Sequence, residues 1–143
     1  MRRTNALIAA ALLLALMPAA AEDRSVQISW ETLAQVSVTR QKDRYVPEFS
    51  KQILALDQRE VKLKGFMMPL EPGMAQTHFL LSAQPPDCGF CMPGTAEQFA
   101  EVRAKVPVKV PSDVIVMSGK FSLVRDDSGG LLYRLTEAVV VNK

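Results

Sequence analysis

Apolar and polar residues alternate with a period of two between residues 61 and 68, a pattern that predicts a β-strand with one buried face. The expected buried face carries Val61, Leu63, Gly65 and Met67. A glycine inside a strand is typical of a bend or of a close approach by another segment, and we expect one of these at Gly65. Turn residues follow at 69–73, and residues 78–83 predict a second strand.

The clearest alternation lies near the C-terminus and predicts a β-hairpin. One face of the outgoing strand carries Ile115, Met117, Gly119, Phe121 and Leu123. Residues 125–130 consist mainly of Asp, Ser and Gly, which are typical of turns. The returning strand carries Leu131, Tyr133, Leu135, Val139 and Val141.

Helical patterns are short. A helix capped by Ser29 is expected at residues 30–34, because a serine directly precedes its first apolar residues. A second helix is expected to open at Pro47 and to continue to Leu56, and a third is predicted over residues 95–105.

The order of these elements predicts the fold class. Residues 41–44 are polar and predict a loop, and residues 106–110, which lie beside prolines, predict a brief edge strand. Five strands with a helix between the second and third indicate an α+β fold dominated by a small, curved antiparallel β-barrel, similar to the oligonucleotide/oligosaccharide-binding (OB) type. We expect this fold to form a single exported domain over residues 22–143, although a barrel of this type does not by itself identify a ligand.

The first twenty-one residues predict a secretory signal peptide. Arg2 and Arg3 precede the unbroken apolar run Ala6–Met17, and small residues follow at Ala19–Ala21. The run is short against the ~20 residues that a membrane-spanning helix needs. We therefore expect cleavage after Ala21, no stable membrane insertion afterwards, and a periplasmic or secreted protein.

Charge and composition exclude several classes of protein. The 143 residues include 17 Lys and Arg against 15 Asp and Glu, and a mixed composition of this kind excludes a disordered tail, a collagen-like fibre and a multi-pass membrane protein. Loss of Arg2 and Arg3 with the signal peptide would leave bases and acids balanced. A neutral protein has no global field to attract nucleic acid, so we expect no nucleic-acid partner.

Several short phrases of the sequence together resemble an uncharacterised family of exported bacterial domains of unknown function. These phrases are Trp30-x-x-Leu33, Gly65-Phe66-Met67-Met68-Pro69-Leu70, Phe79-Leu80-Leu81, Cys88-Gly89-Phe90-Cys91 and Gly119…Tyr133…Ala138-Val139-Val140. The likeness covers most of residues 29–141. Members of that family are often encoded beside ABC-type transporter components, sometimes in zinc-responsive gene clusters, so the resemblance implies an envelope ABC-type permease as partner. It implies no established reaction.

Cys88 and Cys91 are the only cysteines of the chain, and three interpretations of the pair stay open. Outside the cytosol, two neighbouring thiols are normally oxidised unless a metal or a reductant holds them, so the first interpretation is a local structural disulfide. The second is a metal site, with zinc as the candidate cofactor; a four-ligand site needs further donors, and His78 is the candidate. Cu(I) is an alternative ion, since Met92 adjoins the pair.

The third interpretation is a redox pair. A strand, a Cys-x-x-Cys motif and a predicted helix follow one another, as in thioredoxin-like oxidoreductases, where the helix N-terminus stabilises a thiolate. The strand-rich sequence after Cys91 argues against this interpretation, because it predicts no closing helix.

The residues favour binding over catalysis. The sequence contains no paired-carboxylate pattern, phosphate-binding loop or Gly-x-Ser-x-Gly motif, and a lone histidine offers little material for a catalytic triad. We expect a non-enzymatic accessory or binding protein, linked to metal homeostasis or to an ABC-type envelope transport system through the Cys88–Cys91 loop. The alternatives are a thiol–disulfide oxidoreductase and a permease-docking module with a purely structural disulfide.

Overall fold

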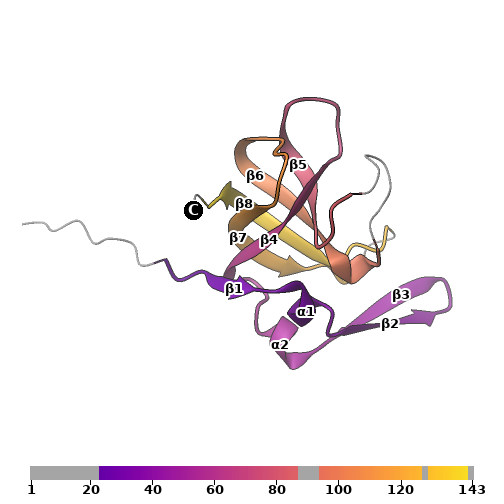
Figure 1. Ribbon diagram of the computed structural model, residues 1–143. Coiled ribbons are helices and arrows are strands. Elements are labelled where there is room, and N and C mark those ends of the chain that lie inside the picture. The colour runs from indigo at the N-terminus through magenta and orange to yellow at the C-terminus, as the bar shows by residue number, and fades with distance from the viewer. Residues whose placement is uncertain (1–22, 87–93, 127–128, 142–143) are drawn as a thin grey trace, which may run out of the picture.

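The structure, a computed structural model, describes residues 23–86, 94–126 and 129–141 (Figure 1). Its strands are β1 (Val26–Ile28), β2 (Val36–Gln41), β3 (Arg44–Phe49), β4 (Glu60–Pro69), β5 (Ala75–Ser82), β6 (Phe99–Lys109), β7 (Ile115–Leu123) and β8 (Tyr133–Val140). Its helical elements are α1 (Trp30–Leu33), α2 (Lys51–Leu54) and the 3₁₀ turn η1 (Ala96–Gln98). In these described ranges, no helix is long and apolar enough to cross a membrane.

Five strands form a closed barrel in the order β4–β5–β6–β8–β7, and pairing of β4 with β7 closes it. This arrangement confirms the predicted small α+β barrel. One detail differs from the prediction: β6 and β8 are parallel, whereas the other neighbours in the ring are antiparallel. The reason is geometric, since a closed ring with an odd number of strands cannot alternate direction at every step. The short strand β1 pairs with β4 outside this ring.

Gly65 is the point at which β4 changes partners. Residues 60–65 of β4 pair with β7, and residues 66–69 pair with β5. A Cβ atom at Gly65 would lie 2.6 Å from the carbonyl oxygen of Ser82, which is closer than two such atoms can approach. The predicted close approach at Gly65 is therefore confirmed, and the strand can bend there because no side chain obstructs its neighbour.

The barrel interior is filled mostly by the apolar faces that the alternation predicted. Val139 is an exception, because a register shift beside Glu137 in β8 buries Ala138 and leaves Val139 39% exposed. The largest fully buried side chains include Tyr133, Phe79 and Phe121, and the rings of Phe121 and Tyr133 are stacked with their centroids 5.6 Å apart. Leu33 of α1 and Ile53 of α2 belong to the same buried cluster, so the two short helices cover part of this core. Burial of aromatic and branched side chains is the main source of stability for such a barrel.

Strands β2 and β3 form a separate two-stranded antiparallel hairpin, residues 36–49, which extends away from the barrel (Figure 1). We call this hairpin the arm. Its register runs from Val36 opposite Phe49 to Gln41 opposite Arg44, so part of the predicted loop at residues 41–44 forms the tip of the arm. Lys42 occupies the tight turn there with a φ of 55°.

The arm corrects the helix that was predicted to open at Pro47. Pro47 lies within β3, opposite Val38, and the helix begins only at Lys51. Proline is tolerated in β3 because both strands of a two-stranded sheet are edge strands. Ser50 then caps α2 by accepting a hydrogen bond from the backbone N–H of Ile53 at 3.3 Å. The helix predicted after Ser29 is confirmed, and Ser29 caps it in the same way.

The helix predicted over residues 95–105 is wrong. Only η1, at residues 96–98, is helical, and β6 then includes both the remainder of that segment and most of the predicted edge strand at 106–110. β6 pairs with β5 on one side and with β8 on the other. Pairing on both sides overrides the helix preference of its Ala, Glu, Lys and Arg residues, since strand preference depends on context.

Candidate functional site

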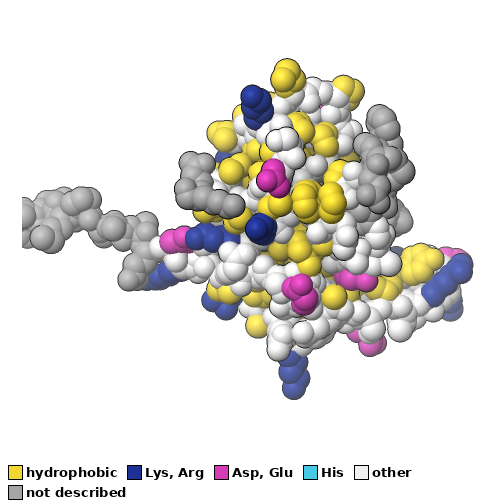
Figure 2. Space-filling view, viewed as in Figure 1, with side chains coloured by type: hydrophobic (Ala, Val, Ile, Leu, Met, Phe, Trp, Pro, Cys, Tyr) yellow, Lys and Arg dark blue, Asp and Glu magenta, His cyan; other side chains and the backbone are white. Residues whose placement is uncertain are grey.

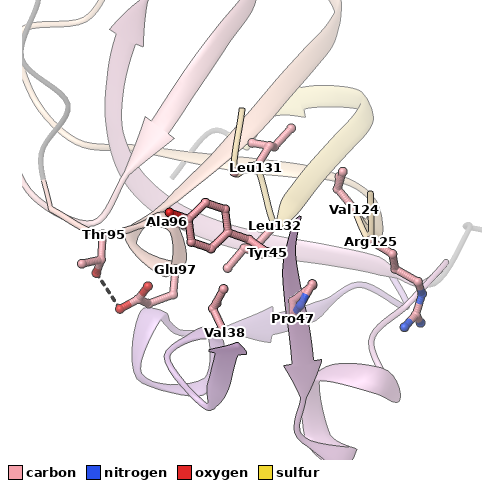
Figure 3. A pocket seen from close by; sticks show the side chains of 11 residues that line it. Val38, Tyr45, Pro47, Thr95, Ala96, Glu97, Val124, Arg125, Leu131 and Leu132 are labelled. Atoms are coloured by element: carbon pink, nitrogen blue, oxygen red, sulfur yellow. Dashed lines mark hydrogen bonds between the residues drawn. The ribbon is translucent and has the colours of Figure 1, made fainter. Parts of the chain in front are cut away.

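An apolar cavity of about 340 Å³ lies between the arm and the barrel (Figure 3). It is lined by Val38, Tyr45, Pro47, Thr95, Ala96, Glu97, Val124, Arg125, Gly130, Leu131 and Leu132. The arm, η1 and the connection between β7 and β8 thus each supply one part of the wall. Cavities of this size and character are typical of small-molecule sites.

Strand pairing explains the arm's side of the cavity. Val38 faces Pro47 across the hairpin, and Arg40 faces Tyr45, so these residues share one surface of the arm. Closer to the barrel, Phe49 packs on the core, with its ring centroid 6.0 Å from that of Tyr133. The base of the arm is therefore anchored on the core, and the rest of the arm extends over the cavity. Tyr45 lies in this second part, with 63% of its surface exposed.

Surface hydrophobic side chains occur both on the barrel and on the arm, and basic side chains lie at the arm's far end (Figure 2). Among the polar side chains of the cavity, Thr95, Glu97 and Arg125 each interact with another side chain. Thr95 donates a hydrogen bond to Glu97 at 2.5 Å, and the Arg125 guanidinium lies over the Phe49 ring at 5.7 Å from its centroid. This arrangement can bury an apolar group and offers polar contacts only at its margin.

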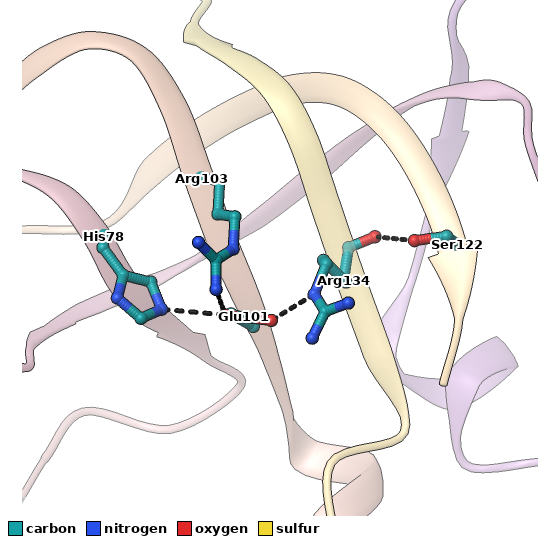
Figure 4. A network of polar contacts seen from close by, with 5 residues as sticks. All are labelled: His78, Glu101, Arg103, Ser122 and Arg134. Carbon is teal, nitrogen blue, oxygen red and sulfur yellow. Dashed lines mark hydrogen bonds and ion pairs between the residues drawn. The ribbon is translucent and has the colours of Figure 1, made fainter. Parts of the chain in front are cut away.

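A polar network forms a second candidate site on the outer surface of β5, β6 and β8 (Figure 4). Glu101 is at its centre. One carboxylate oxygen accepts hydrogen bonds from His78 Nε2 and Arg103 Nη2, both at 2.8 Å, and the other accepts one from Arg134 Nε. Ser122 Oγ lies 3.5 Å from the Arg134 carbonyl oxygen and donates to it.

The electrostatic balance keeps Glu101 ionised. Burial disfavours the charged carboxylate and by itself would raise its pKa. Hydrogen bonds from Arg134 and His78, together with the positive charges of Arg134 and Arg103, outweigh that effect and hold the Glu101 pKa below its usual value. The network is thus a carboxylate that accepts hydrogen bonds from three side chains, two of them guanidinium groups.

Among the residues predicted as a metal site, the structure places only His78. It lies on β5, and its Nε2 atom contacts Glu101. Cys88 and Cys91 lie outside the described residues, so the disulfide, metal and redox hypotheses stay predictions. In residues 23–86, 94–126 and 129–141, no group of three or more His, Cys, Asp and Glu side chains is placed to hold a metal ion. Thr95, which lines the cavity, follows Cys91 by four residues in the sequence.

Sequence reasoning missed both the cavity and the network. Glu101 and Arg103 fell within the predicted helix, although the charged residues Glu101, Arg103 and Lys105 alternate with apolar residues at 100, 102 and 104. That alternation is the signal that could have placed them on the outer face of a strand. The cavity left no comparable local signal, because its walls come from separate parts of the chain.

The fold defines an OB-like barrel domain that carries a hairpin arm. The sequence pattern of the family described as "Protein of unknown function (DUF3299)" matches residues 14–140, and the chain belongs to this family. The predicted resemblance to an uncharacterised family is thereby confirmed.

The fold is similar to a crystal structure of a DUF3299 family protein from Pseudomonas aeruginosa PAO1, with a TM-score of 0.59 and 19% sequence identity over 83% of this chain and 97% of that one. At that identity, the likeness concerns the fold. A comparison with curated proteins gave no match.

Proposed function

We propose that this protein is an exported, non-enzymatic binding protein that holds an apolar group of its ligand in the cavity between the arm and the barrel. The observation that carries the proposal is the apolar lining of that cavity, to which Val38, Ala96, Leu131 and Leu132 contribute. Such a lining supplies burial and shape, which are the requirements of binding.

The size of the cavity limits the ligand group. About 340 Å³ accommodates an aromatic ring or a branched aliphatic group, near the lower end of the range for small-molecule sites. Tyr45 favours an aromatic or amphipathic ligand, because its ring offers apolar area and its hydroxyl a polar end. In Figure 3, the side chains of Val38 and Pro47 from the arm lie on one side of the cavity and that of Leu131 on the other, so an inserted group would contact both walls.

Export and transport belong to the same proposal. The signal-like segment at residues 1–21 supports export to the periplasm or beyond, where the ligand would be an apolar part of an envelope component such as an ABC-type permease. The cysteine pair, with His78, would add zinc binding to this role, and a thiol–disulfide exchange function is the alternative for the pair. Uptake of Zn²⁺ by the reduced protein, with release of thiol protons, would separate the two.

Binding of the uncharged fluorescent probe N-phenyl-1-naphthylamine tests the cavity. The purified protein should bind the probe saturably, and Val38→Ser should weaken binding about fivefold, since it removes apolar contact area from the cavity wall. Val139→Ser is the matched control: both valines lie on strands and are 43% and 39% exposed, but Val139 is outside the cavity. Equal affinities in all three proteins, or equal losses in both variants, would refute the assignment.

A further inference from the structure

The Glu101 side chain is only 8% exposed, although it lies on the outer side of the barrel. Its neighbours Ala100 and Val102 point into the core, so strand alternation directs Glu101 outward. A carboxylate is seldom this buried without partners that compensate its charge. Here the partners come from three adjacent strands, with His78 on β5, Arg103 on β6 and Arg134 on β8.

The positive charge of these partners exceeds the negative charge of Glu101. Two guanidinium groups surround one carboxylate, so the network carries an excess positive charge even when His78 is neutral. The register places them close together, because His78 pairs with Arg103 and Glu101 pairs with Arg134. Glu101 therefore lies between the two arginines and holds one guanidinium at each of its carboxylate oxygens (Figure 4).

Most of the hydrogen-bonding capacity of these arginines is unused within the described part of the chain. Arg103 donates to Glu101 through Nη2 and Arg134 through Nε, and the ion pairs there give neither a second acidic partner. A guanidinium has five N–H donors in a rigid fork that matches the oxygens of carboxylates and phosphates. The side chains are 56% and 36% exposed, respectively, so a ligand can reach them.

We propose that Arg103 and Arg134 form a binding site for a single oxyanion group, a carboxylate or a phosphate, and that Glu101 is the residue that positions them. His78 completes the site by holding Glu101 from the β5 side. The ligand carries little charge, because the network has a small positive excess and the bases and acids of the chain balance once Arg2 and Arg3 are removed with the signal peptide. A polyanion such as a nucleic acid would need a longer basic surface.

The site is independent of the apolar cavity. The oxyanion site lies on the outer face of β5 and β6, the second and third strands of the barrel. In barrels of this type, that face often carries the ligand. The side chains of Glu101, Arg103 and Arg134 are not among those that line the cavity. The uncharged probe and an oxyanion therefore test different surfaces, and failure of one proposal is distinguishable from failure of the other.

Titration of the ¹⁵N-labelled protein, followed by NMR, tests the proposal. Inorganic phosphate and sodium acetate are added in separate series, with sodium chloride holding the ionic strength constant. We expect saturable shifts centred on residues 101–103 and 134 with at least one of the two anions, and the stronger of the two series identifies the ligand class. Chloride alone should give no saturable shift there.

Three variants sharpen the result. Arg103→Gln should weaken binding at least tenfold, and Arg103→Lys should recover only part of the loss, because lysine keeps the charge but not the planar fork. Lys105→Gln is the matched control, since Lys105 is exposed on the same strand and pairs with Glu137 instead. Absence of saturable shifts with both anions, or an equal loss in Lys105→Gln, would overturn the proposal.

Discussion

The barrel and the arm are both built from β-strands, but they are stabilised in different ways. Each barrel strand has neighbours on two sides and an apolar face in the common core. The arm is a two-stranded hairpin whose far end exposes Val38 and Tyr45. Isolated hairpins are at best marginally stable in water. The arm therefore depends on its attachment to the barrel, whereas the barrel carries its own core.

The attachment is formed by a small number of contacts at the base of the arm. Phe49 packs beside Tyr133, and the buried Tyr133 hydroxyl donates a hydrogen bond of 2.5 Å to the carbonyl oxygen of Leu33. Burial, and to a lesser extent the negative charge of Glu97, raises the pKa of Tyr133, so the hydroxyl keeps its proton throughout the ordinary pH range. One side chain of β8 thus connects α1 and the arm to the barrel.

The largest contrast is expected between Phe79→Ala in the barrel and Tyr45→Ala in the arm. Phe79 is fully buried, so its truncation should lower the free energy of unfolding by about 3–5 kcal/mol. Tyr45 is exposed, and its truncation should change that free energy by no more than about 0.5 kcal/mol. Urea unfolding monitored by circular dichroism measures both values. Similar losses in the two variants would show that the arm shares the stability of the core.

An intermediate effect is expected where the two regions meet. Tyr133→Phe removes the hydrogen bond to Leu33 and leaves a buried carbonyl oxygen without its donor, at a cost of about 1–3 kcal/mol. Amide hydrogen exchange should also accelerate in residues 36–49, because the arm loses part of its attachment. Tyr45→Phe, which removes an exposed hydroxyl from the arm itself, is the control and should match the wild type. Unchanged exchange in Tyr133→Phe would contradict the connecting role of this side chain.

The smallest effect concerns the barrel's outer surface and depends on pH. Because the folded-state pKa of Glu101 is lowered, its contribution to stability is present above the unfolded-state pKa of about 4.3 and is lost as the pH falls through the folded-state value. Glu101→Gln should therefore destabilise the protein at pH 7 by about 1 kcal/mol, since partly exposed arginines are screened by water. The difference from wild type should shrink below pH 4.

Urea unfolding at pH 7, 5, 4 and 3 measures this dependence. Glu137→Gln provides the comparison, because Glu137 pairs with Lys105 but is mostly exposed. It should differ from the wild type by a few tenths of a kcal/mol at every pH. If Glu101→Gln and Glu137→Gln show the same loss of stability at every pH, burial does not strengthen the ion pairs of Glu101.

The same contrast explains how much of the fold was predictable. β4 and β7 alternate between core-facing apolar residues and other residues along most of their length, and that alternation was visible in the sequence. β6 was missed because its Ala, Glu, Lys and Arg residues favour a helix in isolation, and pairing with β5 and β8 overrides that preference. The arm was missed because its far end buries little.

The candidate sites were less predictable than the fold. His78 was predicted to be a metal ligand, and in the structure it contacts Glu101. Glu101 had been assigned to a helix over residues 95–105, which gave no reason to expect it beside His78. The network needs three strands in register, and the cavity needs the arm to lie against the connection between β7 and β8. Both depend on contacts between residues far apart in sequence, which local patterns do not encode.

The position of β8 in the ring has a consequence for folding kinetics. It is the last strand along the chain, yet it lies between β6 and β7, and it supplies both Tyr133 and Arg134. During synthesis, the earlier strands emerge first but cannot complete the ring, because their missing neighbour still has to follow. Closure then requires pairings of high sequence separation, which fold slowly. The delay keeps the ring open until residues 133–140 are available to pair with both β6 and β7.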